Sequence, residues 1–228
     1  MHNILITGAS RGLGLGLTRA YLARGARVYA VIRREPSDEL LALSQGHAAR
    51  LRLILCDLDD DQATAHIGEA LQGTRLDRAL FNAGIYGPAH QDPCQVSREE
   101  IAQLFLSNTI APVRLAQTLL PSIGEDGILA FISSQMASVE LARAQDMPLY
   151  GASKAALNSL LRSWSEVPDM SQVTLLALHP GWVRTELGGA DAPLSVEDSV
   201  SGMIAVIEAE AGQPGCRFLD YQGQVLPW

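Results

Sequence analysis

Thr7-Gly8-Ala9-Ser10-Arg11-Gly12-Leu13-Gly14 is the stretch of sequence that decides the fold. An apolar run precedes it and a helical pattern follows it, so the glycines lie between a predicted strand and a predicted helix. Glycines let a backbone turn tightly and approach a pyrophosphate, and a helix N-terminus offers free N–H groups and a positive dipole. We predict a phosphate-binding turn here. The alternative is a glycine turn that only packs the helix on the strand.

The rest of the chain alternates short apolar runs with helical patterns. Nearly continuous Val, Ile, Leu and Ala are typical of parallel strands that are covered on both faces. We predict strands at Asn3–Thr7, Arg27–Ile32, Arg52–Cys56, Arg78–Phe81, Gly127–Ser133 and Val173–Leu178. We predict helices at Leu13–Arg24, Gln62–Leu71, Arg98–Leu120, Tyr150–Glu166 and Val196–Glu208, with a Ser97/Glu100 capping box on the third. This order predicts a single-domain α/β fold over residues 1–228, a Rossmann-type doubly wound parallel sheet with helices on both faces.

Composition narrows the function classes. The 228 residues carry a net charge of −8, which argues against general nucleic-acid binding. The three cysteines form no CxxC pair, so we expect neither a disulfide framework nor a metal site. No basic leader precedes the first strand and no apolar run is long enough to span a membrane, so we expect a cytoplasmic location and no membrane partner.

Seven motifs follow one another in the order of the predicted strands, and together they resemble the short-chain dehydrogenase/reductase family. Residues 7–14 match its TGxxxGxG turn. The others are Cys56-Asp57-Leu58, Asn82-Ala83-Gly84, Asn108 in the following helix, Ile132-Ser133-Ser134, the YxxxK pattern Tyr150-Gly151-Ala152-Ser153-Lys154, and Pro180-Gly181-Trp182-Val183-Arg184-Thr185. The resemblance covers nearly the whole chain. It implies a nicotinamide cofactor and a hydride-transfer reaction.

The resemblance implies four catalytic residues. Tyr150 would be the general acid/base, Lys154 would tune it and hold the nicotinamide ribose, Ser134 would orient the substrate carbonyl, and Asn108 would maintain a water relay. The residues themselves support part of this, because Tyr150 and Lys154 lie four apart on one predicted helix face. A nearby ammonium is expected to lower the pKa of a phenol. Lys154 is also the only lysine of the chain, which is either chance in an arginine-rich composition or a need for a compact ammonium.

Each catalytic candidate also has an ordinary structural interpretation. Tyr150 could be a half-buried helix residue, Ser134 a cap at a strand end, and Asn108 a helix kink before Pro112. The joint presence of these residues and the glycine turn favours the catalytic interpretation.

The second predicted strand indicates which nicotinamide cofactor is preferred. An NAD-specific fold places an acid at the end of this strand to bind the ribose 2′-hydroxyl, whereas here Ile32 stands there and Arg33 follows. Arg33 and Arg11 together suit a 2′-phosphate, unless both are solvated surface charges. We therefore predict NADP(H) in preference to NAD(H). The residues expected to contact it are Gly8, Ser10, Arg11, Gly12, Leu13, Gly14, Arg33, Asp57, Leu58, Asn82, Ala83, Gly84, Tyr150, Lys154, Pro180, Gly181, Val183 and Thr185.

These observations predict an NADP(H)-dependent oxidoreductase that acts on a carbonyl or alcohol carbon of a small organic molecule. The C-terminal segment 218–228 and the residues Thr185–Gly189 resemble those of C-factor-like and sniffer-like carbonyl reductases. The alternative is a cofactor-sensing or signalling protein on the same fold, because fold alone does not fix function. The resemblance further implies a homodimer or homotetramer. We expect Trp228 to be an aromatic plug in the core or at a subunit contact.

Overall fold

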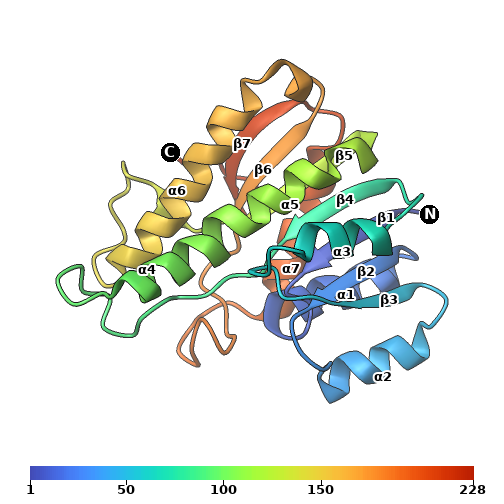
Figure 1. Cartoon of the computed structure of the whole chain (residues 1–228), viewed down its shortest axis with the longest axis horizontal. Coiled ribbons are helices and arrows are strands. Elements are labelled where there is room, and N and C mark those ends of the chain that lie inside the picture. Colours follow the sequence, from blue (N-terminus) through green and yellow to red (C-terminus); the bar gives the residue numbers. More distant parts are fainter.

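A single parallel sheet organises the chain in the computed structural model, which describes residues 1–228 (Figure 1). The strands run in the order β3-β2-β1-β4-β5-β6-β7, and every neighbouring pair is parallel. Their bounds are β1 Asn3–Thr7, β2 Arg27–Ile32, β3 Leu51–Leu55, β4 Leu76–Phe81, β5 Ile123–Ile132, β6 Thr174–His179 and β7 Gly215–Asp220. The order reverses at β1, so the carboxyl ends of β1 and β4 flank a crevice where such sheets bind ligands. The predicted Rossmann-type fold is confirmed.

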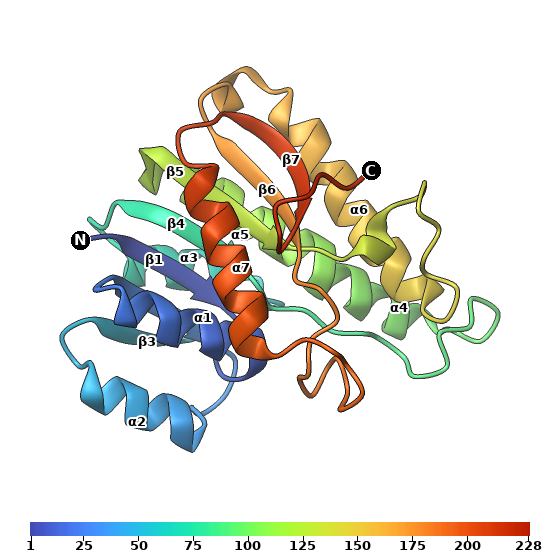
Figure 2. The ribbon, with the colours of Figure 1, turned by 180° about the vertical axis from the view of Figure 1, so that it is seen from behind.

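Helices cover both faces of the sheet. Helices α1 (Gly12–Ala23) and α7 (Val196–Ala209) lie on one face, and α3 (Ala63–Ala70), α5 (Ala111–Leu119) and α6 (Pro148–Ser165) lie on the other (Figures 1 and 2). Helix α2 (Asp38–Gly46) lies beside β3, and α4 (Arg98–Phe105) extends beyond the sheet. The predicted capping box of Ser97 and Glu100 opens α4.

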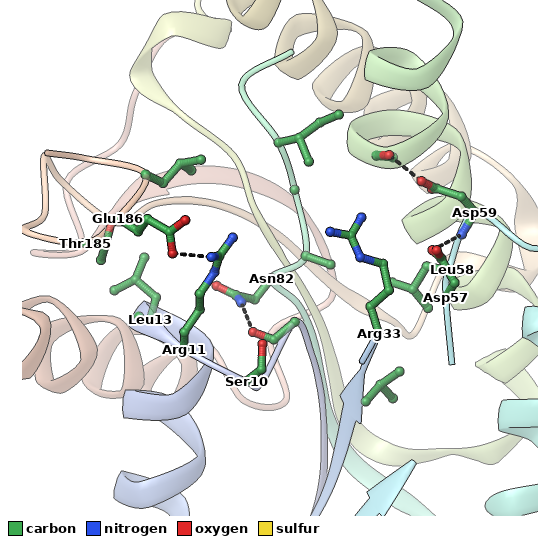
Figure 3. Close-up of a pocket in the computed structure, with 18 of the residues that line it drawn as sticks. Ser10, Arg11, Leu13, Arg33, Asp57, Leu58, Asp59, Asn82, Thr185 and Glu186 are labelled. Carbon is green, nitrogen blue, oxygen red and sulfur yellow. Dashed lines mark hydrogen bonds and ion pairs between the residues drawn. The ribbon is translucent and has the colours of Figure 1, made fainter. Parts of the chain in front are cut away.

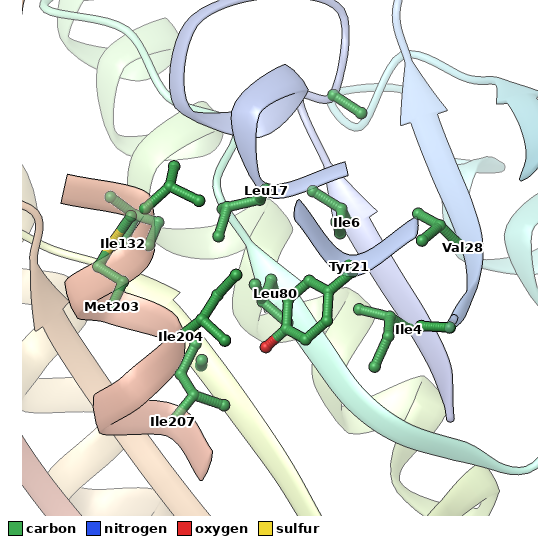
Figure 4. Close-up of a cluster of buried hydrophobic side chains, with 14 of the residues drawn as sticks. Ile4, Ile6, Leu17, Tyr21, Val28, Leu80, Ile132, Met203, Ile204 and Ile207 are labelled. Atoms are coloured by element: carbon green, nitrogen blue, oxygen red, sulfur yellow. The ribbon is translucent and has the colours of Figure 1, made fainter. Parts of the chain in front are cut away.

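Two hydrophobic clusters fix the sheet between these layers. One packs Ile4, Leu17, Tyr21, Met203 and Ile204 between the sheet and the pair α1 and α7 (Figure 4). The other packs residues of α3, α5 and α6 against the opposite face, where Phe81 and Phe131 stack with ring centroids 4.5 Å apart. Burial on both faces holds the strand ends rigidly, which is what a site built on those ends requires.

Three elements differ from the prediction. Helix α2 was not predicted because Leu40 is its only buried residue, so it carries no apolar stripe. Strand β7 was not predicted because it is an edge strand, and polar and small residues interrupt its apolar run. The single helix predicted over Arg98–Leu120 is instead two helices, α4 and α5, joined by a π-helical turn at Leu106–Ile110. The spacing of apolar residues does not reveal a turn that is wider by one residue.

No helix of the structure is both long and apolar enough to cross a membrane.

Candidate active site

The glycine turn leaves β1 and enters α1 at the carboxyl edge of the sheet. Gly8 and Gly12 have φ angles of +66° and +52°, which disfavour other residues. A Cβ atom on Gly14 would lie 2.1 Å from the Gly8 carbonyl oxygen, and one on Gly8 would lie 2.9 Å from the Ala83 Cα. Gly8 and Gly14 are therefore required for packing the turn itself, whereas the missing side chain of Gly12 faces only Thr185, 3.3 Å away.

A cavity of about 460 Å³ opens above this turn (Figure 3). Twelve of the predicted cofactor residues line it, namely Gly8, Ser10, Arg11, Gly12, Leu13, Arg33, Asp57, Leu58, Asn82, Ala83, Gly84 and Thr185. The N-terminus of α1 also faces it, with no side-chain cap and no acidic residue in the first turn. Free N–H groups beside a glycine turn fit a pyrophosphate. Gly14, Tyr150, Lys154, Pro180, Gly181 and Val183 are not part of the cavity lining.

The two arginines proposed to contact a 2′-phosphate have different surroundings. Arg11 forms an ion pair with Glu186 across the mouth of the cavity. Arg33 also lines the cavity, and its exposed guanidinium has no acidic partner. In Figure 3 its side chain reaches toward the cavity from the end of β2, while Arg11 turns to Glu186. The unpaired Arg33 is therefore better placed to receive an anion.

Asn82 supports the turn from the end of β4. Its side-chain amide donates to the carbonyl oxygens of Thr7 and Gly8, each at 3.1 Å. The Thr7 hydroxyl oxygen accepts the backbone N–H groups of Asn82 and Ala83 at 3.0 and 3.2 Å. These contacts use the Asn82 amide hydrogens to join β1 to β4, so Asn82 contributes to the cavity mainly by fixing its floor.

Ser134, Tyr150 and Lys154 lie together beyond the Gly84 end of the cavity. The Ser134 hydroxyl accepts the Met136 N–H at 3.1 Å and lies near enough to the Tyr150 phenol to act on its pKa. The Lys154 Nζ lies 5.9 Å from the centre of the Tyr150 ring and donates to the Ile132 carbonyl at 2.8 Å. A Cβ atom on Gly84 would lie 3.4 Å from that Nζ, so the missing side chain keeps the amine next to the cavity.

Burial dominates the electrostatics of this group. We expected the Lys154 ammonium to lower the pKa of Tyr150. Desolvation instead raises the pKa of this phenol well above its usual value, and only the Ser134 hydroxyl acts in the opposite direction. Burial lowers the pKa of Lys154 to about 8. The phenol therefore keeps its proton at neutral pH, whereas the amine changes its charge at a pH close to neutral.

The buried side chain of Asn108 makes three hydrogen bonds to neighbouring parts of the chain. Its Oδ1 accepts the Ile85 N–H at 2.8 Å, and its Nδ2 donates to the Ile85 carbonyl at 2.8 Å and to the Ser153 hydroxyl at 2.9 Å. Asn108 lies in the π-helical turn, where the backbone departs from regular helix. Its side chain thus ties the strand-end loop after β4 to α6.

The segment after β6 forms the far wall of the cavity. Gly181 has a φ angle of +82°, and its missing Cβ leaves room for Leu194. Val183 is buried and pairs with Leu194, and the Thr185 hydroxyl accepts the Gly188 N–H at 2.9 Å. Pro180 receives a hydrogen bond from Ser199 of α7 at 2.6 Å. Gly181 and Val183 therefore shape the turn that presents Thr185 and Glu186.

Several residues near the site had no signal in the sequence. Asp59 lines the cavity and accepts a hydrogen bond from Ser107 at 2.7 Å. Tyr86 packs edge-on against the Tyr150 ring, with ring centroids 4.8 Å apart. Gln91 accepts the Tyr150 backbone N–H at 3.0 Å. All of them lie in loops or at helix ends, where no periodicity points to a partner.

Trp228 lies away from the cavity. Its ring packs on Phe218 at a centroid distance of 5.5 Å and lies under the Arg162 guanidinium. The Ser138 hydroxyl donates to its carbonyl oxygen at 3.4 Å. Trp228 is nevertheless 37% exposed, so it is not the plug in the core that was one of the two expectations for it.

A family model described as short chain dehydrogenase matches residues 2–193 of the chain. The chain belongs to the short-chain dehydrogenase family. The resemblance drawn from the seven motifs is thereby confirmed. Members of this family are oxidoreductases, and solved relatives of this chain include carbonyl reductases.

Three relatives place the chain within the family. A carbonyl reductase of Pseudomonas aeruginosa PAO1, solved in complex with NADP, is 54% identical with a TM-score of 0.94, and the match covers 100% of both chains. The carbonyl reductase Sniffer of D. melanogaster is 30% identical with a TM-score of 0.86, again over 100% of both chains. The C-signal of Myxococcus xanthus is 38% identical over 158 residues, which are 67% of this chain and 93% of that protein.

Proposed function

We propose that this chain is an NADPH-dependent reductase of carbonyl groups in small organic molecules, with Tyr150 as its general acid. The observation that carries the proposal is the buried group of Ser134, Tyr150 and Lys154 at the Gly84 end of the cavity. The 54% identical carbonyl reductase solved with NADP supports the cofactor and the reaction class.

The cavity would hold the part of the cofactor from the adenine to the pyrophosphate, and the nicotinamide end would lie beyond Gly84. The uncapped N-terminus of α1 would receive the pyrophosphate, Arg33 the 2′-phosphate, and Asp57 and Leu58 the adenine side. Asn82, Ala83 and Gly84 lead from there to Lys154, which would hold the nicotinamide ribose. The bound cofactor would supply the hydride to the carbonyl carbon.

The chain's own side chains would then bind the carbonyl oxygen of the substrate and protonate it. The Ser134 hydroxyl donates a hydrogen bond to that oxygen, and the Tyr150 hydroxyl transfers its proton to it as the carbonyl becomes an alcohol. The resulting Tyr150 phenolate is stabilised by the nearby Lys154 ammonium.

Turnover of NADPH with a panel of aldehydes, ketones and quinones tests this proposal. We expect absorbance at 340 nm to fall with at least one class of carbonyl compound and to be stable without it. NADPH binding with no turnover of any carbonyl compound would favour a cofactor-sensing protein. The similarity to C-signal is the observation behind this alternative.

Arg33→Asp tests the cofactor preference. Loss of a charged partner of the 2′-phosphate, replaced by a repelling carboxylate, should weaken NADPH binding about 10- to 150-fold. NADH lacks that phosphate, so its affinity should change far less, and fluorescence titration with both cofactors measures the difference. Arg34→Asp, on the adjacent exposed residue outside the cavity lining, is the matched control. Equal weakening of NADPH and NADH by Arg33→Asp would contradict the assignment.

A further inference from the structure

The loop after β4 contains a buried glutamine that the chemistry above does not use. Gln91 is 6% exposed, although it lies in a loop that extends away from the sheet. Its φ angle is +51°, a left-handed conformation that residues other than glycine adopt only at a cost. The surrounding contacts must hold it there, and such residues concentrate at functional sites.

Three hydrogen bonds use both ends of the Gln91 amide. Its Nε2 donates to the Tyr86 and Pro88 carbonyl oxygens, each at 2.8 Å. Its Oε1 accepts the backbone N–H of Tyr150 at 3.0 Å. One side chain therefore closes its own loop and attaches that loop to the residue that bears the catalytic phenol.

The position of Tyr150 in α6 makes this bond important. Tyr150 is the third residue of the helix, and its N–H is one of the first-turn donors that have no partner within a helix. Met147, at the N-cap, offers no side-chain hydrogen bond. Gln91 thus caps α6 from a different loop, 59 residues earlier in the sequence.

The same side chain also positions a second aromatic ring. The Tyr86 carbonyl is held by Gln91, and the Tyr86 ring packs edge-on against Tyr150. Loop and helix thus enclose the Tyr150 phenol between them.

We propose that Gln91 is a positioning residue for catalysis. Its hydrogen bonds to the backbones of Tyr86 and Tyr150 hold the Tyr150 phenol and the Tyr86 ring in a fixed position relative to each other. This inference rests on the proposed function for its kinetic consequence, but its structural consequence is measurable without turnover.

Gln91→Met is the test, because methionine has a similar length and makes none of the three bonds. We expect kcat to fall at least about tenfold, because small displacements of a catalytic group are costly. The KM for the carbonyl substrate and the Kd for NADPH should stay within about twofold, since the residues proposed to hold the cofactor are untouched. Gln95→Met is the matched control in the same loop, where an exposed glutamine contacts only Asp92, and it should leave all three constants unchanged.

A phenol titration at 295 nm gives a second readout that does not depend on turnover. Burial raises the pKa of both Tyr86 and Tyr150, so loosening the loop should lower both pKa values in Gln91→Met. Tyr86→Phe and Tyr150→Phe versions assign the two signals.

The proposal is overturned if kcat per bound NADPH in Gln91→Met stays within about twofold of wild type, or if the two phenols titrate as before. A shifted titration in a protein that turns over no carbonyl compound would instead uphold the role of Gln91 and refute the proposed function. Should Gln91→Met not fold, Gln91→Gly removes the same bonds while relieving the positive φ, and the same outcomes apply.

Discussion

Tyr150→Phe is expected to reduce carbonyl turnover about 10²- to 10⁴-fold, because the ring keeps its packing while the proton donor is lost. The Tyr86 and Gln91 contacts do not involve the Tyr150 hydroxyl, so they should survive the change. NADPH should bind with nearly unchanged affinity, as measured by fluorescence titration. Steady-state oxidation of NADPH with the best carbonyl substrate measures the loss.

Tyr29→Phe is the matched control for this change. The Tyr29 hydroxyl contacts Thr74, which comes just before β4 and so lies at the amino ends of the strands, opposite the cavity. Its removal should leave kcat unchanged. Activity of Tyr150→Phe within a few-fold of wild type would exclude Tyr150 as the general acid.

Lys154→Arg is expected to lower turnover about 10²- to 10³-fold, a loss typical of removing one preorganised electrostatic group from a site. The substitution keeps the positive charge but replaces a compact ammonium with a broad planar fork. The amine is 4% exposed and is confined between the Ile132 carbonyl and Gly84, so a guanidinium must displace one of them.

The burial of Lys154 also makes the stability of the fold depend on pH. Since folding lowers its pKa from 10.5 to about 8, the charged amine destabilises the fold below pH 8, and this cost fades as the pH rises toward 10.5. The stability of wild type relative to Lys154→Met should therefore rise across that range in denaturant unfolding. A normal kcat for Lys154→Arg, or a stability difference that does not vary with pH, would place the lysine outside the site.

The sequence predicted the parts of the fold that repeat a pattern. Strands β1 and β2 have the predicted bounds because both are buried on two faces and so consist of apolar runs. Helix α2 buries only Leu40, and in edge strand β7 only the neighbouring Phe218 and Leu219 are fully buried, so each leaves a weak pattern. The π-helical turn changes the backbone without changing the spacing of apolar residues.

Some features of the site likewise follow a pattern in the sequence, and others do not. Twelve of the predicted cofactor residues line the cavity because every parallel strand ends at the same edge, whereas Pro180, Gly181 and Val183 after β6 do not. The pairing of Arg11 with Glu186, and the bond from Gln91 to Tyr150, join residues that lie far apart in sequence. Such contacts depend on how two loops meet, and no spacing along the chain encodes that. The raised pKa of Tyr150 was unpredictable for a related reason, because burial is a property of the assembled layers.

The central place of β1 in the sheet has a consequence for folding kinetics. The first strand of the chain pairs with β2 on one side and with β4, more than seventy residues later, on the other, and the Thr7–Asn82 bonds close only then. Contacts of this range are slow to form, whereas isolated helical turns form in about a microsecond or less. A refolding chain will therefore regain helical signal well before it can bind NADPH, and the interval between the two signals reports the assembly of the β1–β4 pair.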